Sequence, residues 1–484
     1  MQPSKGKKSL SEINKYCTKS NLLVKTYADI LKEFNLNYIN LLLSKSKSKG
    51  ENAAKIFQIL FVLQYFDLKN IRDFYQSKKS QCIDFKKDVL YDFMKNPKID
   101  WRTIIYLFIK QLFKVIESKQ TADKQEVKPA TFFILDDTLI EKSGKKIEQI
   151  GKVFDHCSHS YSIGMKILTL GFWDGKSFIP LDFSIHNEPG KTGQRGLKKK
   201  DIDNQFTKDR TEDSAGFKRI KEISVDKINM ALNLVGNAVK RKIVANYVLA
   251  DSWFICESFL MGISSLSPKV DVIGLMKTNR IIEINGKKHK ASNIPENKQT
   301  KVSYCKAFKC YYITHKMVYK SIEMKGFWIK MKGQDSWKLL ISTDQKLNFI
   351  KAMKYYQVRW SIEVFFKDCK QNLGINNCQS TDLDAYFAHF SIVMMNYMVL
   401  SLRKRFEDYE TLGELFKHTK ELILEKNLVE KIWEIIIELY IQIFSELGAD
   451  LDFFIQKIIR MKENLEIFIK NTLGILSLTN QRAA

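Results

Sequence analysis

The sequence contains little of what would make a chain fibrous, disulfide-bonded or membrane-spanning. Seven prolines and 21 glycines in 484 residues exclude a collagen-like or proline-rich protein. The first ten residues, MQPSKGKKSL, lack the apolar core of a secretory signal. The longest apolar run, residues 390–402, is too short to span a bilayer. Eight cysteines form no CxxC pair, so neither a disulfide framework nor a zinc ribbon is indicated; they stand at positions 17, 82, 157, 256, 305, 310, 369 and 378. We therefore expect a soluble protein from a reducing compartment.

Positive charge, by contrast, is in large excess. Lys and Arg number 79 against 54 Asp and Glu, which gives a formal net charge of +25. Hydrophobic residues make up 45% of the chain, so it can bury a substantial core. A charge excess of this size predicts a polyanionic partner, most often nucleic acid. Because residues 401–484 are near neutral, we expect DNA to lie on the parts of the chain before them.

Hydrophobic spacing divides the chain into regions of different character. Apolar residues recur at helical intervals through residues 53–66 and 104–116, and a polar stretch at 118–129 follows as a predicted linker. Four strands are predicted next, at residues 130–135, 162–173, 177–185 and 243–250. A helix is expected at residues 226–240, after a polar segment at 188–221 that we predict to be a mobile loop. This order favours an α/β fold with a mixed sheet.

The remainder of the chain returns from strands to helices. Residues 270–343 are strand-like, and Asn285-Gly286 is a hairpin signal. Residues 347–373 predict one strong helix, and helical periodicity dominates from about residue 385 to the end.

The predicted helix at 347–373 carries a polar stripe. Tyr356, Arg359, Glu363 and Lys370 are separated by 3, 4 and 7 positions, and they fall within an arc of about 60°. Apolar residues occupy the opposite side: Val358, Ile362, Phe365 and Cys369. Such a stripe is compatible with an ordinary solvated face in which Arg359 and Glu363 form an i,i+4 pair. It also presents a carboxylate flanked by two cations and a phenol.

Two apolar runs end directly in aspartate. The run TFFIL is followed by Asp136-Asp137-Thr138, and the run IVANYVLA is followed by Asp251-Ser252. Each aspartate is compatible with a strand-terminating loop residue, but a carboxylate just beyond a buried strand also lies at the rim of a sheet, where α/β folds place ligand sites. Three carboxylates from separate elements can hold two divalent metal ions for phosphodiester chemistry. A second cluster, His156, Cys157 and His159, lacks a partner pair with zinc spacing, so loop or core residues are favoured there.

Taken together, these positions resemble a known family. The motif Tyr-x2-Arg-x3-Glu-x6-Lys is matched in full from Tyr356 to Lys370, after both aspartates. It is similar to that of bacterial insertion-sequence DDE transposases, specifically the insertion-sequence-four family. The resemblance implies Asp136, Asp251 and Glu363 as catalytic residues and ligands of two Mg²⁺ ions, with Mn²⁺ as a substitute. Asp136 is preferred to Asp137 because it matches the first position of Asp-x-Thr, and Asp137 would face the other way if the strand continues.

The same resemblance implies the architecture. It predicts an α/β fold with a ribonuclease-H-like catalytic core at residues 126–384, containing a β-rich insertion at about 270–343. A helical DNA-binding domain at residues 1–125 and a helical region at 385–484, a candidate for dimerisation, would flank this core. Phosphate contacts would come from Tyr356, Arg359, Lys370 and Thr138. Either Trp337 or Trp328 would stack a flipped base, although core packing is the favoured role for each.

The activity implied is cut-and-paste transposition. Water would nick one strand at the terminal inverted repeats and free a 3′-hydroxyl. That hydroxyl would attack the opposite strand to form a hairpin, which is then reopened. The 3′ ends would finally join target DNA. The implied partners are element and target DNA together with a second protomer, in the cytoplasm of a bacterium and associated with the nucleoid. Two alternatives remain open: a transposase-derived DNA-binding protein without catalysis, and a ribonuclease-H-like nuclease selective for DNA structure.

Overall fold

The computed structural model describes residues 30–47, 49–66, 70–77, 83, 85–119, 129–155, 158–297, 300–421 and 439. The chain divides into two compact units. One comprises Lys95–Leu402, and the other is formed by Met1–Met94 with Arg403–Ala484. Apart from residue 439, the part of the predicted C-terminal helical region beyond residue 421 lies outside the described residues.

The unit formed by the two ends of the chain is helical where it is described. The predicted helix at 53–66 is confirmed as α4 (Ala53–Val62), extended by a 3-10 turn. Asn52 caps α4 by accepting the N–H groups of Ala54 and Lys55. The other described helices before residue 95 are α3 (Asn37–Lys45), α5 (Ile71–Gln76) and α6 (Lys87–Met94).

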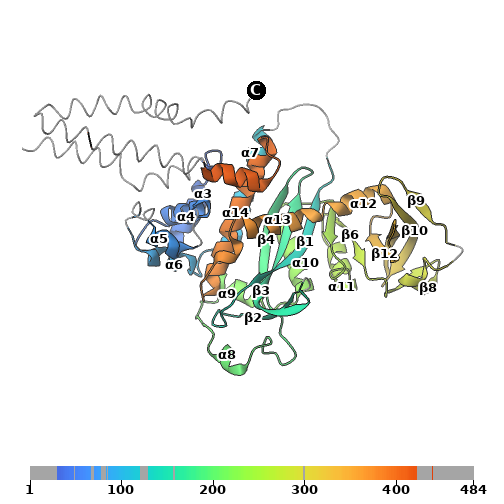
Figure 1. Cartoon of the computed structure of the whole chain (residues 1–484), viewed down its shortest axis with the longest axis horizontal. Helices are drawn as coiled ribbons and strands as arrows, with labels where there is room; N and C mark the ends of the chain where they lie inside the picture. The colour runs from blue at the N-terminus through green and yellow to red at the C-terminus, as the bar shows by residue number, and fades with distance from the viewer. Residues whose placement is uncertain are drawn as a thin grey trace, which may run out of the picture. The chain divides into compact units, whose positions relative to one another are not determined.

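The larger unit is built on a mixed sheet. Its central strands run in the order β4 (Phe178–His186), β3 (Ser160–Trp173), β1 (Phe132–Glu141), β5 (Tyr247–Ala250) and β6 (Asp271–Met276). The first three are antiparallel neighbours, whereas β5 and β6 run parallel to β1. The predicted strands are confirmed, and Figure 1 shows this sheet at the centre of the unit. The large mixed sheet with its helices is consistent with a ribonuclease-H-like DDE domain.

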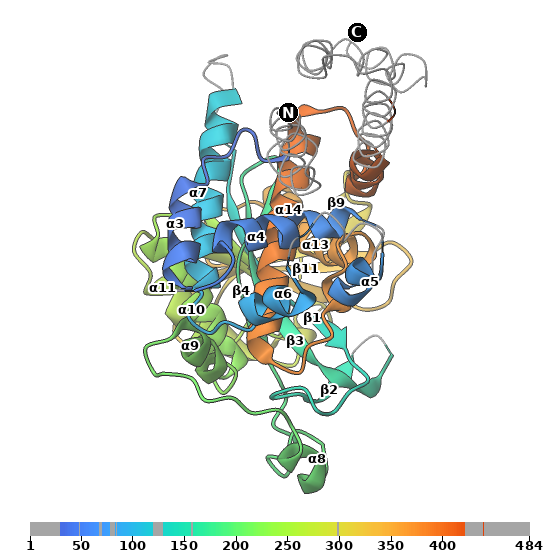
Figure 2. The same cartoon turned by 90° about the vertical axis from the view of Figure 1, so that its left-hand side faces the viewer.

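Helices cover both faces of the sheet (Figure 2). On one face, α13 (Trp360–Gln371) and α14 (Leu383–Phe406) pack Phe365 and Tyr397 against Phe178 of β4. On the other, α7 (Trp101–Lys119) packs Phe113 against Phe172 of β3, and α10 (Lys227–Lys240) accompanies it. Burial of each such aromatic side chain contributes about 1.5–3 kcal/mol, so the two helical layers hold the sheet from both sides.

Helix α7 belongs to the same unit as the sheet, although it lies within the region predicted as the N-terminal domain. The Nε of Arg102 donates to the fully buried Asp182 of β4 at 2.9 Å, and its two terminal nitrogens bind Glu222. A buried carboxylate requires such a partner. This ion cluster therefore ties α7 to the sheet rather than to the helices that precede it in the sequence.

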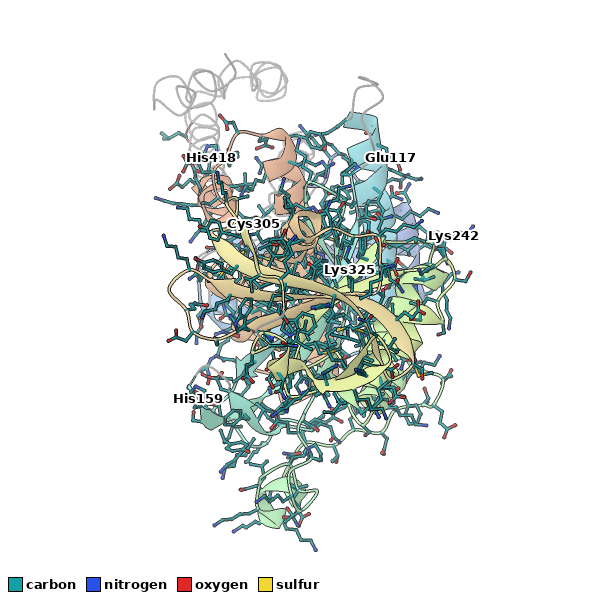
Figure 3. The ribbon with its side chains drawn as sticks, turned by 90° about the vertical axis from the view of Figure 1, so that its right-hand side faces the viewer. Glu117, His159, Lys242, Cys305, Lys325 and His418 are labelled. Carbon is teal, nitrogen blue, oxygen red and sulfur yellow. The ribbon has the colours of Figure 1, made fainter. Side chains whose placement is uncertain are left out.

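The strands added after β6 continue the same sheet. β12 (Lys338–Ser342) pairs with β6, and β11 (Ile322–Met331) and β10 (Cys310–Tyr319) follow outward. The hairpin predicted at Asn285-Gly286 is confirmed between the strands β7 (Ile281–Ile284) and β8 (Lys287–Lys290), with both turn residues at positive φ. Figure 3 looks onto these added strands, with Cys305 of β9 (Ser303–Cys305) and Lys325 of β11 labelled. β6, which starts at Asp271, pairs in parallel with β5, and the strands from β7 onward pair antiparallel.

Two predictions of local structure are wrong. The segment 188–221 is not wholly a loop: it contains the short helices α8 (Lys199–Asp203) and α9 (Ala215–Glu222), and it buries charged side chains such as those of Arg210 and Arg219. The helix predicted at 347–373 is broken into α12 (Phe349–Gln357) and α13, because the N–H groups of Val358, Arg359 and Ser361 bond three residues back instead of four.

Helix α14 is long and carries an extended apolar surface. It is long and apolar enough to cross a membrane by length and composition, yet 89% of its most apolar window is buried inside the protein. Its apolar surface is thus explained by packing within the fold, for example of Phe387 and Phe390 against Phe183 of β4.

Candidate functional site

Asp136 lies inside a strand rather than at its end. β1 pairs with β3 over its whole length, but β5 pairs only with residues 132–134 of β1. The strand therefore does not terminate at Leu135, as the sequence suggested. Instead its parallel neighbour ends at Ala250, and Asp251 follows immediately beside this part of β1. The two aspartates come together because one strand is shorter than the other.

Asp251 is fixed by its own turn. Its Oδ1 accepts the backbone N–H of Trp253 at 2.9 Å, an Asx-type arrangement that holds the carboxylate at the end of β5. Its negative charge lies near enough to Asp136 to raise the pKa of that carboxyl group. Trp253 itself is 45% exposed, so a large aromatic surface stands directly next to this acid.

Helix α12 is anchored over the same strands by aromatic packing. The ring of Tyr355 lies with its centroid 5.0 Å from that of Phe132 in β1 and 5.4 Å from that of Tyr247 in β5. This contact places the next residue, Tyr356, near Asp136 and Asp251. Burial, with the charge of Asp251 adding to it, raises the pKa of Tyr356 to about 12, although Arg359 acts in the opposite direction.

Arg359 joins two of the predicted acids. Its Nη1 donates to Oδ2 of Asp136 at 2.9 Å, and its Nη2 donates to Oε1 of Glu363. The residue stands in the short turn between α12 and α13, so the break in the predicted helix lies where the guanidinium meets the sheet. On the buried side of α13, Ile362, Phe365 and Cys369 are packed as predicted. Asp136, Arg359 and Glu363 are thus in direct contact, with Asp251 and Tyr356 beside them.

The ionisation of Asp136 is strongly perturbed. Burial, together with the charges of Asp251 and Asp137, raises the pKa of Asp136 to about 7, although the charge of Arg359 lowers it. A carboxyl group with such a pKa is half protonated near neutrality, which is typical of functional sites.

Asp137 faces the opposite side of the strand, as alternation along β1 requires. Its carboxylate lies 2.5 Å from Nζ of Lys227 and 3.4 Å from Nε2 of His186. Burial would raise its pKa, but the hydrogen bond from His186 and the Lys227 ammonium lower the pKa well below its usual range. No motif in the sequence pointed to Lys227 or His186. The only local signal was that Lys227 opens α10 after the capping residue Asp226.

The other predicted site residues lie at different distances from this centre. Thr138 follows Asp136 by two positions in β1 and so shares its face. Lys370 is exposed on α13, about two helical turns beyond Glu363. Trp337 lies just before β12, which is separated from β1 by β5 and β6. Trp328 is fully buried and its indole N–H donates to the carbonyl of Ala291 at 2.8 Å, so its favoured role in core packing is confirmed.

The fit of a metal ion to these residues can be tested on their contacts. Three carboxylates are the oxygen donors that Mg²⁺ prefers. Among the residues that the structure describes, however, no three His, Cys, Asp or Glu side chains form a group arranged to hold a metal ion. The reason at this site is that Arg359 binds both Asp136 and Glu363. In this arrangement the acids therefore do not fit a metal centre.

Two protein families match the chain. The family described as DDE superfamily endonuclease matches residues 82–292, which contain Asp136 and Asp251. The family described as Transposase DDE domain matches residues 228–399, which contain Asp251 and Glu363. These matches support a DDE transposase family. No curated protein matches the chain. Domains of this transposase type generally use divalent metal ions and act on DNA.

The raised pKa of Asp136 predicts how stability changes with pH. Because the folded-state pKa of about 7 exceeds the ordinary aspartate pKa of 3.8, the folded state binds a proton more tightly than the unfolded state. Stability is then lost as pH rises between these values, by about 4 kcal/mol at most. The melting temperature of Asp136→Asn minus that of wild type should therefore be larger at about pH 8 than at about pH 5, when both are measured without divalent ions. A difference in melting temperature that is the same at both pH values would contradict this linkage.

Proposed function

We propose that this protein is a DNA transposase that moves an insertion sequence by cut-and-paste transposition. The observation that carries the proposal is the gathering of Asp136, Arg359 and Glu363, with Asp251 beside them, from three separate elements. The two family matches and the net charge of +25 support the same reaction class on a polyanionic substrate.

The proposed reaction is a series of displacements at phosphorus. Water attacks a phosphodiester at the end of the element and breaks one P–O bond, which leaves a 3′-hydroxyl. That hydroxyl attacks the opposite strand, closes a hairpin and releases flanking DNA; water reopens the hairpin, and the 3′-hydroxyl then joins target DNA. Each transfer makes one P–O bond and breaks one, so no external energy source is needed.

In this proposal Asp136, Asp251 and Glu363 are the catalytic carboxylates and would hold two Mg²⁺ ions, or Mn²⁺ in their place, once Arg359 no longer binds Asp136 and Glu363. When bound, such ions would activate the attacking oxygen and stabilise the leaving one. Tyr356, Arg359, Lys370 and Thr138 would bind phosphates near the scissile bond. Trp337, at the start of the added strand β12, would stack a base next to it, because it is partly exposed whereas Trp328 is not.

The remaining parts of the proposal concern assembly. Residues 1–125 would recognise the terminal inverted repeats, and residues 385–484 would help two protomers pair in a synaptic complex. The reaction would take place in the bacterial cytoplasm, in association with the nucleoid. The excess of Lys and Arg in the N-terminal region supports DNA contact but carries no sequence preference, and the apolar residues of the C-terminal region support pairing.

A plasmid assay tests the function directly. Purified protein is incubated with a supercoiled donor that carries the inverted repeats flanking its gene, together with Mg²⁺ or Mn²⁺. Nicks at the repeat ends, hairpin products and joined target are expected. Nicking without strand joining would favour the structure-selective nuclease, and DNA binding without any nicking would favour the transposase-derived binding protein.

A second test concerns where DNA lies on the catalytic unit. Residues 143–152 and 189–205 form a lobe beyond the end of β1, seen as the region around α8 and β2 in Figure 1. Its exposed cations are Lys145, Lys146, Lys152, Lys191, Lys198, Lys199 and Lys200. The lobe is held in place because the backbone N–H of Lys152 donates to the carbonyl of Arg195 at 2.8 Å and the side-chain amide of Gln205 donates to that of Ile150 at 2.9 Å.

Charge reversal on this lobe should weaken DNA binding. The triple change of Lys198, Lys199 and Lys200 to Glu is expected to lower affinity for duplex DNA by about tenfold or more. It should also reduce the slope of log affinity against log salt by roughly one per lost phosphate contact. Fluorescence anisotropy over a series of salt concentrations measures both. The matched control reverses Lys287, Lys288 and Lys290 of β8, and an equal loss in both variants would attribute the effect to net charge alone.

A further inference from the structure

One positive side chain lies between two of the three acids. Arg359 donates one terminal nitrogen to Asp136 and the other to Glu363, and its side chain is only 16% exposed. A divalent cation bound by both carboxylates would need the space between them. The guanidinium therefore occupies the position that such a cation would take.

We propose that Arg359 and a divalent cation compete for Asp136 and Glu363, so that the cation binds only after the guanidinium has moved to another anion. The proposal rests on the proposed function in one respect, which is that the other anion is a DNA phosphate. The competition itself concerns only the free protein and its carboxylates.

The chemistry of the guanidinium makes displacement necessary. An arginine side chain remains protonated at any pH the protein meets, so it cannot give up the carboxylates by losing its charge. It can leave only by exchanging them for another anion, and the planar fork that binds a carboxylate binds a phosphate equally well. Arg359 is placed for this exchange because it stands in the turn between α12 and α13, next to Trp360, which is 62% exposed.

The exchange couples the two ligands. If a phosphate that holds Arg359 raises the affinity for the cation by some factor, the cation must raise the affinity for DNA by the same factor. Arg359 would thus prevent the site from holding its cation until DNA is present, and would then become a phosphate contact itself.

The first test titrates the metal-free protein with Mn²⁺ and follows the free ion by electron paramagnetic resonance. At about pH 8, above the pKa of Asp136, Arg359→Gln should bind Mn²⁺ at least about tenfold more tightly than wild type. Lys367→Gln removes one positive charge from the exposed side of the same helix and should change the affinity less than about twofold. Equal affinity in Arg359→Gln and wild type, with both folded by circular dichroism, would overturn the proposal.

Two further variants guard against misfolding and against binding elsewhere. Arg359→Lys keeps the positive charge, but its ammonium cannot bind the two carboxylates with the two arms of a guanidinium. Its affinity for Mn²⁺ should therefore fall between those of wild type and Arg359→Gln. Adding Glu363→Gln to Arg359→Gln should remove the gain. A gain that persists in this double variant would place the new Mn²⁺ site away from Glu363 and contradict the competition.

The second test uses DNA. The affinity of wild type for a short labelled duplex carrying a repeat end is measured in Ca²⁺ and in NaCl of equal ionic strength. Ca²⁺ should strengthen DNA binding by wild type, and it should not strengthen DNA binding by Arg359→Gln.

The two proposals can fail separately. Nicking by wild type with unchanged Mn²⁺ affinity in Arg359→Gln would reject the competition alone, whereas tighter Mn²⁺ binding without any nicking would reject the transposase alone.

Discussion

Glu363→Gln is expected to abolish nicking at the repeat ends while leaving DNA affinity within about twofold of wild type. The amide keeps the size of the side chain but removes one of the three negative charges that gather beside β1. Loss of a group on which the reaction directly depends lowers turnover by about 10³-fold or more. Nicking is measured on the supercoiled donor and DNA affinity by fluorescence anisotropy, so the two effects are separated.

A matched variant exists in the other unit of the chain. Glu407 pairs with Arg403 at i,i+4 spacing, just as Glu363 pairs with Arg359, and it follows the last residue of α14. Glu407→Gln should nick DNA at close to the wild-type rate. Substantial nicking by Glu363→Gln, or an equal loss in both variants, would remove Glu363 from the catalytic role.

Much of the catalytic unit could be predicted from local patterns. The strands β3 and β4, the helix α10 and the hairpin at Asn285-Gly286 lie within a few residues of their predicted positions. These elements are specified by short-range signals, namely apolar alternation, a capping aspartate and turn residues that tolerate positive φ. Their formation depends little on the rest of the chain.

The contacts of the site could not be predicted in the same way. Arg359 meets Asp136 across 223 positions of sequence, and Lys227 meets Asp137 because α10 packs against β3 and β4, of which β3 pairs with β1. The helical spacing of the polar residues predicted that Arg359 and Glu363 share one stripe. It carried no information on the second contact of the guanidinium, with an aspartate of a distant strand. The position of Asp136 inside β1 was missed because it depends on β5 being shorter than its neighbour.

Composition was misleading at residues 188–221. A polar segment rich in lysine and arginine predicts a solvated loop, since charged side chains are seldom buried. Here several are buried, because each has a partner of opposite charge. Arg210 binds both oxygens of Glu148 at 2.7 and 2.6 Å and Oδ2 of Asp384 at 2.9 Å. Lys208 binds Asp382 and Asp384 at 2.9 and 3.0 Å. The cluster joins three separate segments of the chain, which a local pattern cannot reveal.

Arg210→Met is therefore expected to cause the largest loss of stability of any substitution considered. Only 3% of the Arg210 side chain is exposed, and its removal would leave the buried acids Glu148, Asp382 and Asp384 with Lys208 as their remaining cation. Removing one partner of a buried charge cluster costs about 3–5 kcal/mol, which corresponds to a melting temperature lower by roughly 10 °C. Differential scanning calorimetry measures this change.

The control is a surface ion pair of the same lobe. Lys145 is 47% exposed and binds Asp201 at 3.0 Å, so Lys145→Met should cost less than about 1 kcal/mol. Limited proteolysis tests the segment locally. Wild type should resist cleavage at 188–214, whereas Arg210→Met should be cleaved there before other sites. The reason is that the charge cluster around Arg210 joins this segment to Glu148 and to the start of α14. The cluster would not hold the segment if Arg210→Met had the same melting temperature as Lys145→Met and if wild type were cleaved at 188–214 as fast as Arg210→Met. The mobile loop predicted from composition would then describe the segment better.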